Sequence, residues 1–286
     1  MAARSSNCGW WRPRRDIAGL RAIVTGGSSG VGRALALALS RRKAQVLATA
    51  RRGERLAELA AVNDGGEPIL HEAGDLCDAA FRRHLVTSAV ARLGGIDLVV
   101  AAAGAGAIGP FRNAEAATLA GILDIDLVAP AELVRACLPY LSEGRDPAIV
   151  FVGSILALHP LPLHGEYSAA KAGLRSLAGS LRQELAADGI EVSLATLGPV
   201  ASEFWDALVT GARPAWSRGR PISAEQAAAA ILHGLERRRP EIIPGWRAKG
   251  YALVSRFLPG LIDRAAARHV SMAKAHSAGA RRRTDA

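Results

Sequence analysis

Tyr167 and Lys171 stand four residues apart in the stretch YSAAK, separated only by small side chains. On a helix, positions i and i+4 lie above one another on one face, so a phenol and an ammonium would project side by side. A free tyrosine has a pKa of about 10, and a neighbouring ammonium stabilises the phenolate and lowers that pKa. The pair could therefore transfer a proton near neutral pH. The alternative interpretation is an exposed helix pair without a chemical role.

Ser154 ends the apolar stretch AIVFVGS, thirteen residues before Tyr167. Its hydroxyl could hydrogen-bond a substrate oxygen and stabilise negative charge that develops there. The alternative is a hydroxyl at a strand end that only satisfies the backbone. His159, His164 and Glu166 follow closely, and we expect them to line a substrate loop or the surface rather than to act in catalysis. Their spacing predicts no metal site.

A glycine-rich turn, TGGSSGVG at 25–32, lies between a predicted first strand and first helix. Glycine lets the backbone adopt a positive φ and lets a ligand approach without a Cβ in the way. The amides at the start of the next helix favour a phosphate group. This placement, immediately after the first strand, is typical of a dinucleotide site.

The end of the second predicted strand indicates which dinucleotide is bound. An NAD site usually places an acidic residue about twenty residues after the glycines. Here the sequence reads ATARRGER, with Arg51 and Arg52 and no acid before Glu54. A guanidinium suits the additional 2′-phosphate of NADP. We therefore predict NADP(H), the alternative being a solvated arginine pair at a helix start.

Short runs of Val, Ile, Leu and Ala alternate with longer helical stretches along the chain. Unbroken apolar runs suit strands that are buried on both faces, and intervening helices imply parallel crossovers. The fold class predicted is α/β, a doubly wound parallel sheet (Rossmann-like) in a single domain. The predicted strands are 20–26, 45–50, 68–70, 96–104, 148–154 and 190–199, and the predicted helices are 32–44, 54–61, 79–93, 113–141, 164–188 and 223–239.

The charge of the chain is concentrated at its ends. Of a formal net charge of +10, residues 1–16 carry +3 and residues 264–286 carry +5. We expect 1–16 and 269–286 to be disordered basic tails flanking one domain, 17–268. Aromatic residues make up only 5% of the chain and are not interleaved with a basic patch, which argues against a nucleic-acid partner.

The cysteines and apolar segments bear on the compartment. Three widely spaced cysteines predict neither a disulfide framework nor a zinc site and favour a reducing compartment. The N-terminus lacks the apolar region of a signal peptide, and the longest apolar run, 98–111, is too short to span a bilayer. These features predict a cytoplasmic protein.

Six short motifs in this order resemble the short-chain dehydrogenase/reductase family over about 17–205. They are TGGSSGVG, GDL at 74–76, AAAG at 101–104, Ser154, YSAAK and LGPVAS at 197–202. The resemblance implies an oxidoreductase that interconverts a carbonyl and an alcohol. Tyr167 would be the acid or base, supported by Lys171 and Ser154, with Asp126 at the fourth catalytic position. The implied cofactor contacts are Thr25, Gly26, Ser28, Ser29, Gly30, Val31, Gly32, Arg51, Arg52, Asp75, Leu76, Ala103, Gly104, Tyr167, Lys171, Gly198, Pro199, Val200 and Ser202.

The chain departs from the family pattern at three places. The family usually has Asn-Asn-Ala-Gly where this chain has AAAG, Asn at the position of Asp126, and Pro at the position of Leu197. An aspartate could still hold a water but cannot donate a hydrogen bond as an amide does, and it adds negative charge near Lys171. The alternative function is therefore a dinucleotide-binding sensor or scaffold with little turnover.

The region after Ser202 is expected to form a substrate flap and cap, 203–268. Phe204, Trp205 and Leu208 predict a mobile flap over a bulky or lipid-like apolar substrate. The basic, apolar segment 247–268 is interpreted as a lid on the pocket or on a partner subunit, the alternative being peripheral contact with an anionic membrane. The family resemblance implies a homodimer or homotetramer through 113–141 and 164–188.

Overall fold

The computed structural model describes residues 13–62, 64–206, 208–211, 219 and 221–268. At its centre lies a seven-stranded parallel sheet in the order β3-β2-β1-β4-β5-β6-β9. The strands are β1 (Arg21–Thr25), β2 (Gln45–Ala50), β3 (Ile69–Ala73), β4 (Leu98–Ala101), β5 (Ala148–Ser154), β6 (Glu191–Leu197) and β9 (Glu241–Ile242), with a separate short pair of β7 (Val200–Ala201) and β8 (Ile222–Ser223). The predicted doubly wound α/β fold in one domain is confirmed.

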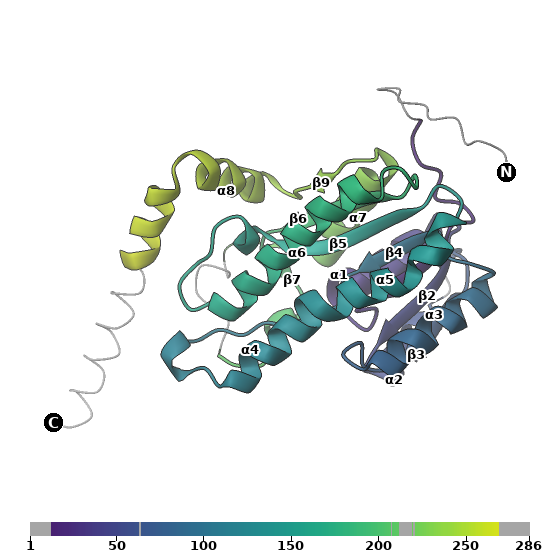
Figure 1. Cartoon of the computed structure of the whole chain (residues 1–286), viewed down its shortest axis with the longest axis horizontal. Coiled ribbons are helices and arrows are strands. Elements are labelled where there is room, and N and C mark those ends of the chain that lie inside the picture. Colours follow the sequence, from purple (N-terminus) through teal and green to yellow (C-terminus); the bar gives the residue numbers. More distant parts are fainter. Residues whose placement is uncertain (1–12, 63, 207, 212–218, 220, 269–286) are drawn as a thin grey trace.

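Helices cover both faces of this sheet (Figure 1). One apolar cluster joins the sheet to α1, α2 and α7, and the other joins it to α3, α5 and α6. The helices are α1 (Gly30–Arg41), α2 (Gly53–Ala60), α3 (Ala79–Leu93), α4 (Ala116–Leu123), α5 (Ala129–Ser142), α6 (Gly165–Glu184), α7 (Ala224–Glu236) and α8 (Trp246–Phe257). The predicted capping box at the start of α7 is present, because Ser223 and Gln226 exchange side-chain to backbone hydrogen bonds.

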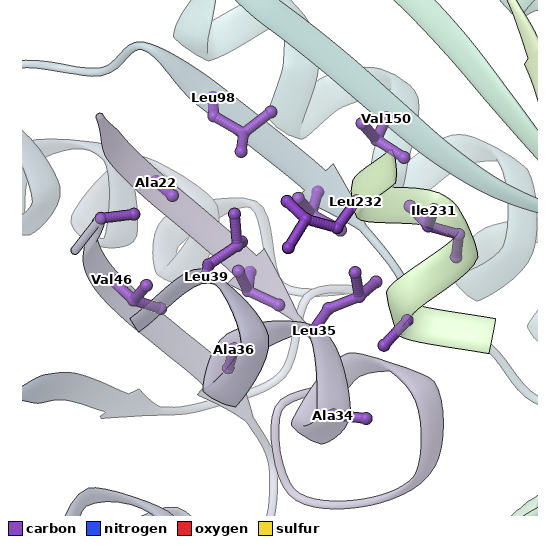
Figure 2. Packing of buried hydrophobic residues seen from close by; sticks show 14 of the residues in the cluster. Ala22, Ala34, Leu35, Ala36, Leu39, Val46, Leu98, Val150, Ile231 and Leu232 are labelled. Carbon is purple, nitrogen blue, oxygen red and sulfur yellow. The ribbon is translucent and has the colours of Figure 1, made fainter. Parts of the chain in front are cut away.

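Alternate residues of each strand divide between the two apolar clusters, because successive side chains point to opposite faces of a sheet. In β1, Ala22 and Val24 face α1 and α7, whereas Ile23 faces the opposite layer. Figure 2 shows Leu35 of α1 and Leu232 of α7 packed together over the strands. Burial on both faces explains why the strands read as unbroken apolar runs.

The carboxyl ends of the parallel strands meet at one edge of the sheet. The strand order reverses beside β1, whose neighbours are β2 on one side and β4 on the other. Loops that leave such a point diverge to opposite faces and open a crevice between them. The topology therefore places the glycine turn after β1, the AAAG loop after β4 and Ser154 of β5 at the same edge.

The helix predicted over 113–141 is interrupted by a wider turn. A single turn of 3₁₀ helix, η1 (Phe111–Asn113), precedes α4, and a π-helical turn, η2 (Asp124–Val128), joins α4 to α5. In this turn the Ala129 amide donates to the Asp124 carbonyl, five residues back. Pro130 has no amide hydrogen and cannot donate to the Asp126 carbonyl, which favours a widened turn at this position.

The expectation that 1–16 forms a disordered tail is wrong at its end. Arg15 is buried, where it pairs with Glu191 at 3.0 Å and with Asp146 at 3.3 Å. Arg238 binds both of the same carboxylates at 2.7 Å. This network of two arginines and two acids fixes the chain before β1 to the amino-terminal side of the sheet. The remaining tail residues, 1–12 and 269–286, lie outside the described residues.

Candidate active site

A cavity of about 600 Å³ opens at the carboxyl edge of the sheet. It runs from the glycine turn and Arg52, past the AAAG loop, to Ser154 and Tyr167. All the residues predicted for catalysis or cofactor binding line it, with the exception of Thr25. The structure therefore brings together residues from the carboxyl ends of six strands, β1 to β6, and from α6 and η2.

The glycine turn forms a cradle that has no room for larger side chains. Gly26 has φ +72° and Gly30 has φ +55°, values that residues with a Cβ rarely adopt. A Cβ on Gly32 would lie 2.4 Å from the Gly26 carbonyl oxygen. α1 begins at Gly30, so the first turn of the helix, whose amides have no partner within the helix, lines the cavity. This cradle fits the phosphates of a dinucleotide.

Arg52 lines the cavity beside the glycine turn. Its guanidinium donates to the Ser28 and Ser29 hydroxyls, with a distance of 2.7 Å to Ser29 Oγ. It also pairs with Glu203 at 3.0 Å, and Arg55 binds the other oxygen of the same carboxylate at 2.9 Å. Two guanidiniums thus converge on one anionic group at the place expected for a 2′-phosphate. Sequence reasoning missed Glu203, for which no motif gave a signal.

Tyr167 and Lys171 project side by side from α6, as their spacing predicts. The Lys171 ammonium lies 5.8 Å from the centre of the Tyr167 ring. It also donates to the Val152 carbonyl at 3.2 Å, which fixes the ammonium under the end of β5. Ser154 is buried at that strand end, and its hydroxyl accepts from the Leu156 amide. Ser154, Tyr167 and Lys171, three of the four side chains predicted for catalysis, therefore line the same cavity.

Asp126 occupies the fourth position of this cluster. It is fully buried, and its carboxylate lies 2.9 Å from the Lys171 ammonium. A Cβ on Gly104 would lie 2.4 Å from Asp126 Oδ1, so the glycine leaves the space that the carboxylate occupies. The π-helical turn carries this side chain into the site. The lysine thus has an anionic partner in addition to the tyrosine beside it.

The charges of the cluster act on one another. Burial raises the pKa of Tyr167, and the negative charge of Asp126 raises it further. Lys171 and the hydrogen bond with Ser154 lower the same pKa, but by less. The expected acidification by Lys171 is present, but the net shift of the tyrosine pKa is upward. Burial disfavours the Lys171 ammonium, yet Asp126 holds the pKa of Lys171 above its usual range. The ion pair keeps the lysine charged and weakens its effect on the tyrosine.

Thr25, which is predicted to contact the cofactor, is the one predicted site residue that does not line the cavity. The Thr25 side chain is buried, and its hydroxyl accepts hydrogen bonds from the Ala102 and Ala103 amides, both at 2.9 Å. The AAAG loop lacks the two Asn side chains that the family pattern has at this place. The hydroxyl of Thr25 holds the loop through its backbone instead.

The substrate end of the cavity is covered by the start of the predicted flap. The Phe204 ring lies 5.8 Å from the Tyr167 ring and 5.4 Å from the Trp205 ring. The Val209 amide donates to the Gly106 carbonyl at 2.8 Å, which joins the flap to the loop after β4. Most of the rest of the predicted flap, residues 207, 212–218 and 220, lies outside the described residues. Sequence reasoning missed the opposite wall, formed by Thr118, Gly121 and Ile122 of α4.

The C-terminal segment was expected to be a lid, but no residue of 246–268 lines this cavity. α8 instead extends along the outside of the molecule and is followed by a second helical stretch, 259–268 (Figure 1). The Tyr251 hydroxyl donates to the His159 carbonyl at 2.8 Å, and His159 binds Asp263 at 2.9 Å. These contacts hold both helices against the loop after β5, beside the cavity rather than over it. Among the residues that the structure describes, no helix combines the length and apolar character needed to cross a bilayer.

Comparison with known proteins identifies the family to which the chain is similar. The family model for short chain dehydrogenases matches residues 21–212. A short chain dehydrogenase of Pseudocercospora fijiensis is 33% identical over 193 residues, which cover 66% of this chain and 62% of that protein.

Solved structures extend the comparison to the fold. A Burkholderia cenocepacia short chain dehydrogenase in complex with NADP superposes with a TM-score of 0.74 at 25% identity, over 82% of this chain and 100% of that one. A Burkholderia phymatum short chain dehydrogenase/reductase in complex with NAD superposes with a TM-score of 0.74 at 23% identity, over 80% of this chain and 90% of that one. With its ordered motifs, parallel sheet and matching family model, this chain belongs to the short-chain dehydrogenase/reductase family.

Proposed function

We propose that the protein is an NADP(H)-dependent oxidoreductase that interconverts a carbonyl and an alcohol on a bulky, apolar substrate. The observation that carries this proposal is the convergence of Ser154, Tyr167 and Lys171 in a cavity that begins at a glycine cradle. Family membership supports oxidoreductase chemistry with a nicotinamide dinucleotide. The identity of the dinucleotide and of the substrate rests on the arguments below.

The proposed chemistry assigns a separate task to each side chain. A bound nicotinamide would supply or accept the hydride. Tyr167 donates a proton to the forming alkoxide in reduction and removes it in oxidation. Ser154 donates a hydrogen bond to the substrate oxygen and stabilises the charge that develops on it. Lys171 stabilises the phenolate form of Tyr167 by its charge and, through its bond to Val152, remains fixed in position.

The preference for NADP over NAD rests on the cationic end of the cavity. Arg51 and Arg52 line it, and no acidic side chain stands at the end of β2 to bind ribose hydroxyls. Arg52 and Arg55 already share the carboxylate of Glu203. A 2′-phosphate offers these guanidiniums a stronger, doubly charged acceptor. The Glu203 carboxylate, which both guanidiniums bind in the structure, would compete with that phosphate.

The substrate class rests on the apolar walls around Tyr167. The apolar side chains that line the cavity include Phe204, Trp205 and Leu208 of the flap, Ile122 of α4 and Ile155 after β5. Such walls bind apolar surface and offer few hydrogen bonds to a small polar molecule. A ketone or secondary alcohol attached to a large hydrocarbon framework therefore fits this end best.

A sensor or scaffold with little turnover is the second candidate, favoured by the Asp126–Lys171 ion pair. In that case the dinucleotide would bind, but the weakened effect of Lys171 would leave Tyr167 a poor acid and base. Both candidates use the same glycine cradle, so cofactor binding alone does not distinguish them.

The test is to titrate the purified protein with NADPH and with NADH, and then to follow NADPH absorbance with a panel of bulky ketones. The proposal expects tighter binding of NADPH and oxidation of it by at least one ketone. Tyr167→Phe should abolish turnover and retain binding, whereas the control Tyr140→Phe, on α5 outside the cavity, should be unchanged. The sensor would be favoured if NADPH binds, no ketone in the panel is reduced, and the Tyr167→Phe variant binds NADPH equally well.

A further inference from the structure

α8 presents an apolar stripe to the solvent. Trp246, Leu253 and Phe257 are 79%, 62% and 66% exposed. At 3.6 residues per turn, positions 246, 253 and 257 fall on one face of the helix. The opposite face carries Ala248, which is buried, and Tyr251, which bonds to His159. The helix therefore packs on the protein through Ala248 and Tyr251 and turns Trp246, Leu253 and Phe257 outward.

Cations flank this stripe on both sides. The same helical spacing places Arg247 on one side and Lys249 and Arg256 on the other. The Arg247 guanidinium lies 5.5 Å from the Trp246 ring, and the Arg256 guanidinium lies 5.8 Å from the Phe257 ring. Residues 246–268 carry five basic side chains and one acid, Asp263, a net charge of +4. An apolar stripe between cations is the arrangement of helices that lie in a membrane interface.

The same end of the molecule carries further exposed apolar side chains beside the cavity. Leu163 and Phe111 are both exposed, and the Gly109 amide donates to the Leu163 carbonyl at 2.9 Å. Leu163 directly precedes His164, which lines the cavity. In Figure 1 the helical stretch 259–268 and the turn before α4 lie at this one end. Exposed apolar side chains thus occur both on the helices of 246–268 and beside the cavity.

We propose that the exposed face of 246–268 docks the protein on an anionic lipid bilayer, with the rim of the cavity turned toward the lipid. Charge complementarity favours this occupant, because anionic headgroups can pair with Arg247, Lys249 and Arg256 while the stripe enters the acyl boundary. A second copy of the chain would bring two surfaces of net charge +4 together. The tethers from Tyr251 and Asp263 to the His159 loop hold the docking face beside the cavity. This inference does not depend on the reaction that the cavity catalyses.

The test is sedimentation of the full chain with vesicles of phosphatidylcholine, with and without phosphatidylserine. We expect the partition coefficient to be at least about tenfold higher with phosphatidylserine, and high salt to reduce it. The triple substitution Arg247→Gln, Lys249→Gln and Arg256→Gln should lower binding about a hundredfold, since each cation contributes about fivefold. The matched control is Arg83→Gln, Arg135→Gln and Arg237→Gln, three exposed cations elsewhere, which should leave most of the binding intact.

A second variant tests the apolar stripe. Trp246→Ser with Phe257→Ser should lower binding to the anionic vesicles by about tenfold or more, whereas Val62→Ser, an exposed apolar control after α2, should not. Absence of vesicle binding by the full chain overturns the proposal, and so does equal loss in the test and control triples. Self-association that disappears in Trp246→Ser/Phe257→Ser without vesicle binding would assign the surface to a protein contact. NADPH titration of each variant should remain unchanged, which separates this test from that of the catalytic proposal.

Discussion

Replacement of Asp126 by asparagine tests how charge in the active site controls proton transfer. The substitution preserves shape and removes one negative charge from the cluster. Asp126 Oδ1 lies 2.9 Å from Lys171 Nζ, which itself lies 5.8 Å from the centre of the Tyr167 ring. These two distances place the carboxylate no more than about 9 Å from the ring centre. Asparagine can still accept a hydrogen bond from the lysine through its side-chain oxygen.

The magnitude follows from the loss of one charge at that distance. With an effective dielectric constant of about 20, two unit charges about 9 Å apart interact by about 2 kcal/mol. Since one pH unit corresponds to 1.36 kcal/mol, the pH profile should move by roughly one unit. An anion opposes ionisation of the phenol, so its removal lowers the pKa of Tyr167. In alcohol oxidation the deprotonated tyrosine is the active form, and the rising limb should therefore move to lower pH.

The assay is kcat/KM for oxidation of an alcohol, measured across pH 6 to 11 with an alcohol identified by the ketone panel. Below the rising limb, Asp126→Asn should be about tenfold faster than the parent protein at the same pH. Asp124→Asn is the matched control, because it makes the same change of charge within the same π-helical turn and Asp124 does not line the cavity. Thermal unfolding of each variant checks that the fold is retained.

Two results would refute this reasoning. If the rising limb of the pH profile of Asp126→Asn stays in place or moves to higher pH, the Asp126 carboxylate does not oppose ionisation of Tyr167. An equal shift in Asp124→Asn would show that net charge, and not the contact with Lys171, sets the profile. Gain of turnover in Asp126→Asn from an inactive parent would instead support the sensor candidate and explain it by the same ion pair.

Three further outcomes can be measured. Glu203→Gln removes the carboxylate that pairs with Arg52. In parallel fluorescence titrations we expect NADPH to bind severalfold more tightly and NADH binding to be unchanged. Arg15→Met breaks a buried ion pair, and urea denaturation should show a free energy of unfolding lower by about 3 kcal/mol, whereas the exposed Arg14→Met should have little effect. Gly104→Ala places a Cβ 2.4 Å from Asp126 Oδ1, and kcat for ketone reduction should fall about a hundredfold because that clash displaces the carboxylate. An unchanged kcat would mean that the AAAG loop shifts to accommodate the methyl group without moving Asp126.

The sequence predicted the sheet and most of the cavity because both depend on local patterns. Unbroken apolar runs such as 148–154 identify doubly buried strands, and the loops after parallel strands necessarily meet at one edge. Lys171 stands one helical turn from Tyr167, so its place beside the ring follows from spacing alone. Asp75 and Leu76 likewise line the cavity, where GDL follows the third strand.

Features that depend on contacts distant in the sequence could not be predicted in this way. Arg15 reads as part of a basic tail, and only the approach of Glu191 and Asp146 gives it buried partners. Glu203 meets Arg52 from a loop about 150 residues away, a pairing with no local pattern. The π-helical turn had one overlooked signal, Pro130, because a proline within a helical stretch removes a backbone donor.

The departures of this chain from the family pattern alter the charge of the site more than its shape. Loss of the amide side chains in AAAG would loosen the loop, but Thr25 binds two of its backbone amides. A Cβ on Gly104 would clash with the Asp126 carboxylate, which lies in the π-helical turn and pairs with Lys171. Because the loop is secured by its backbone, the geometry of Tyr167 and Lys171 does not depend on the missing amides. What remains different is a buried negative charge, and a single substitution at Asp126 isolates its effect on catalysis.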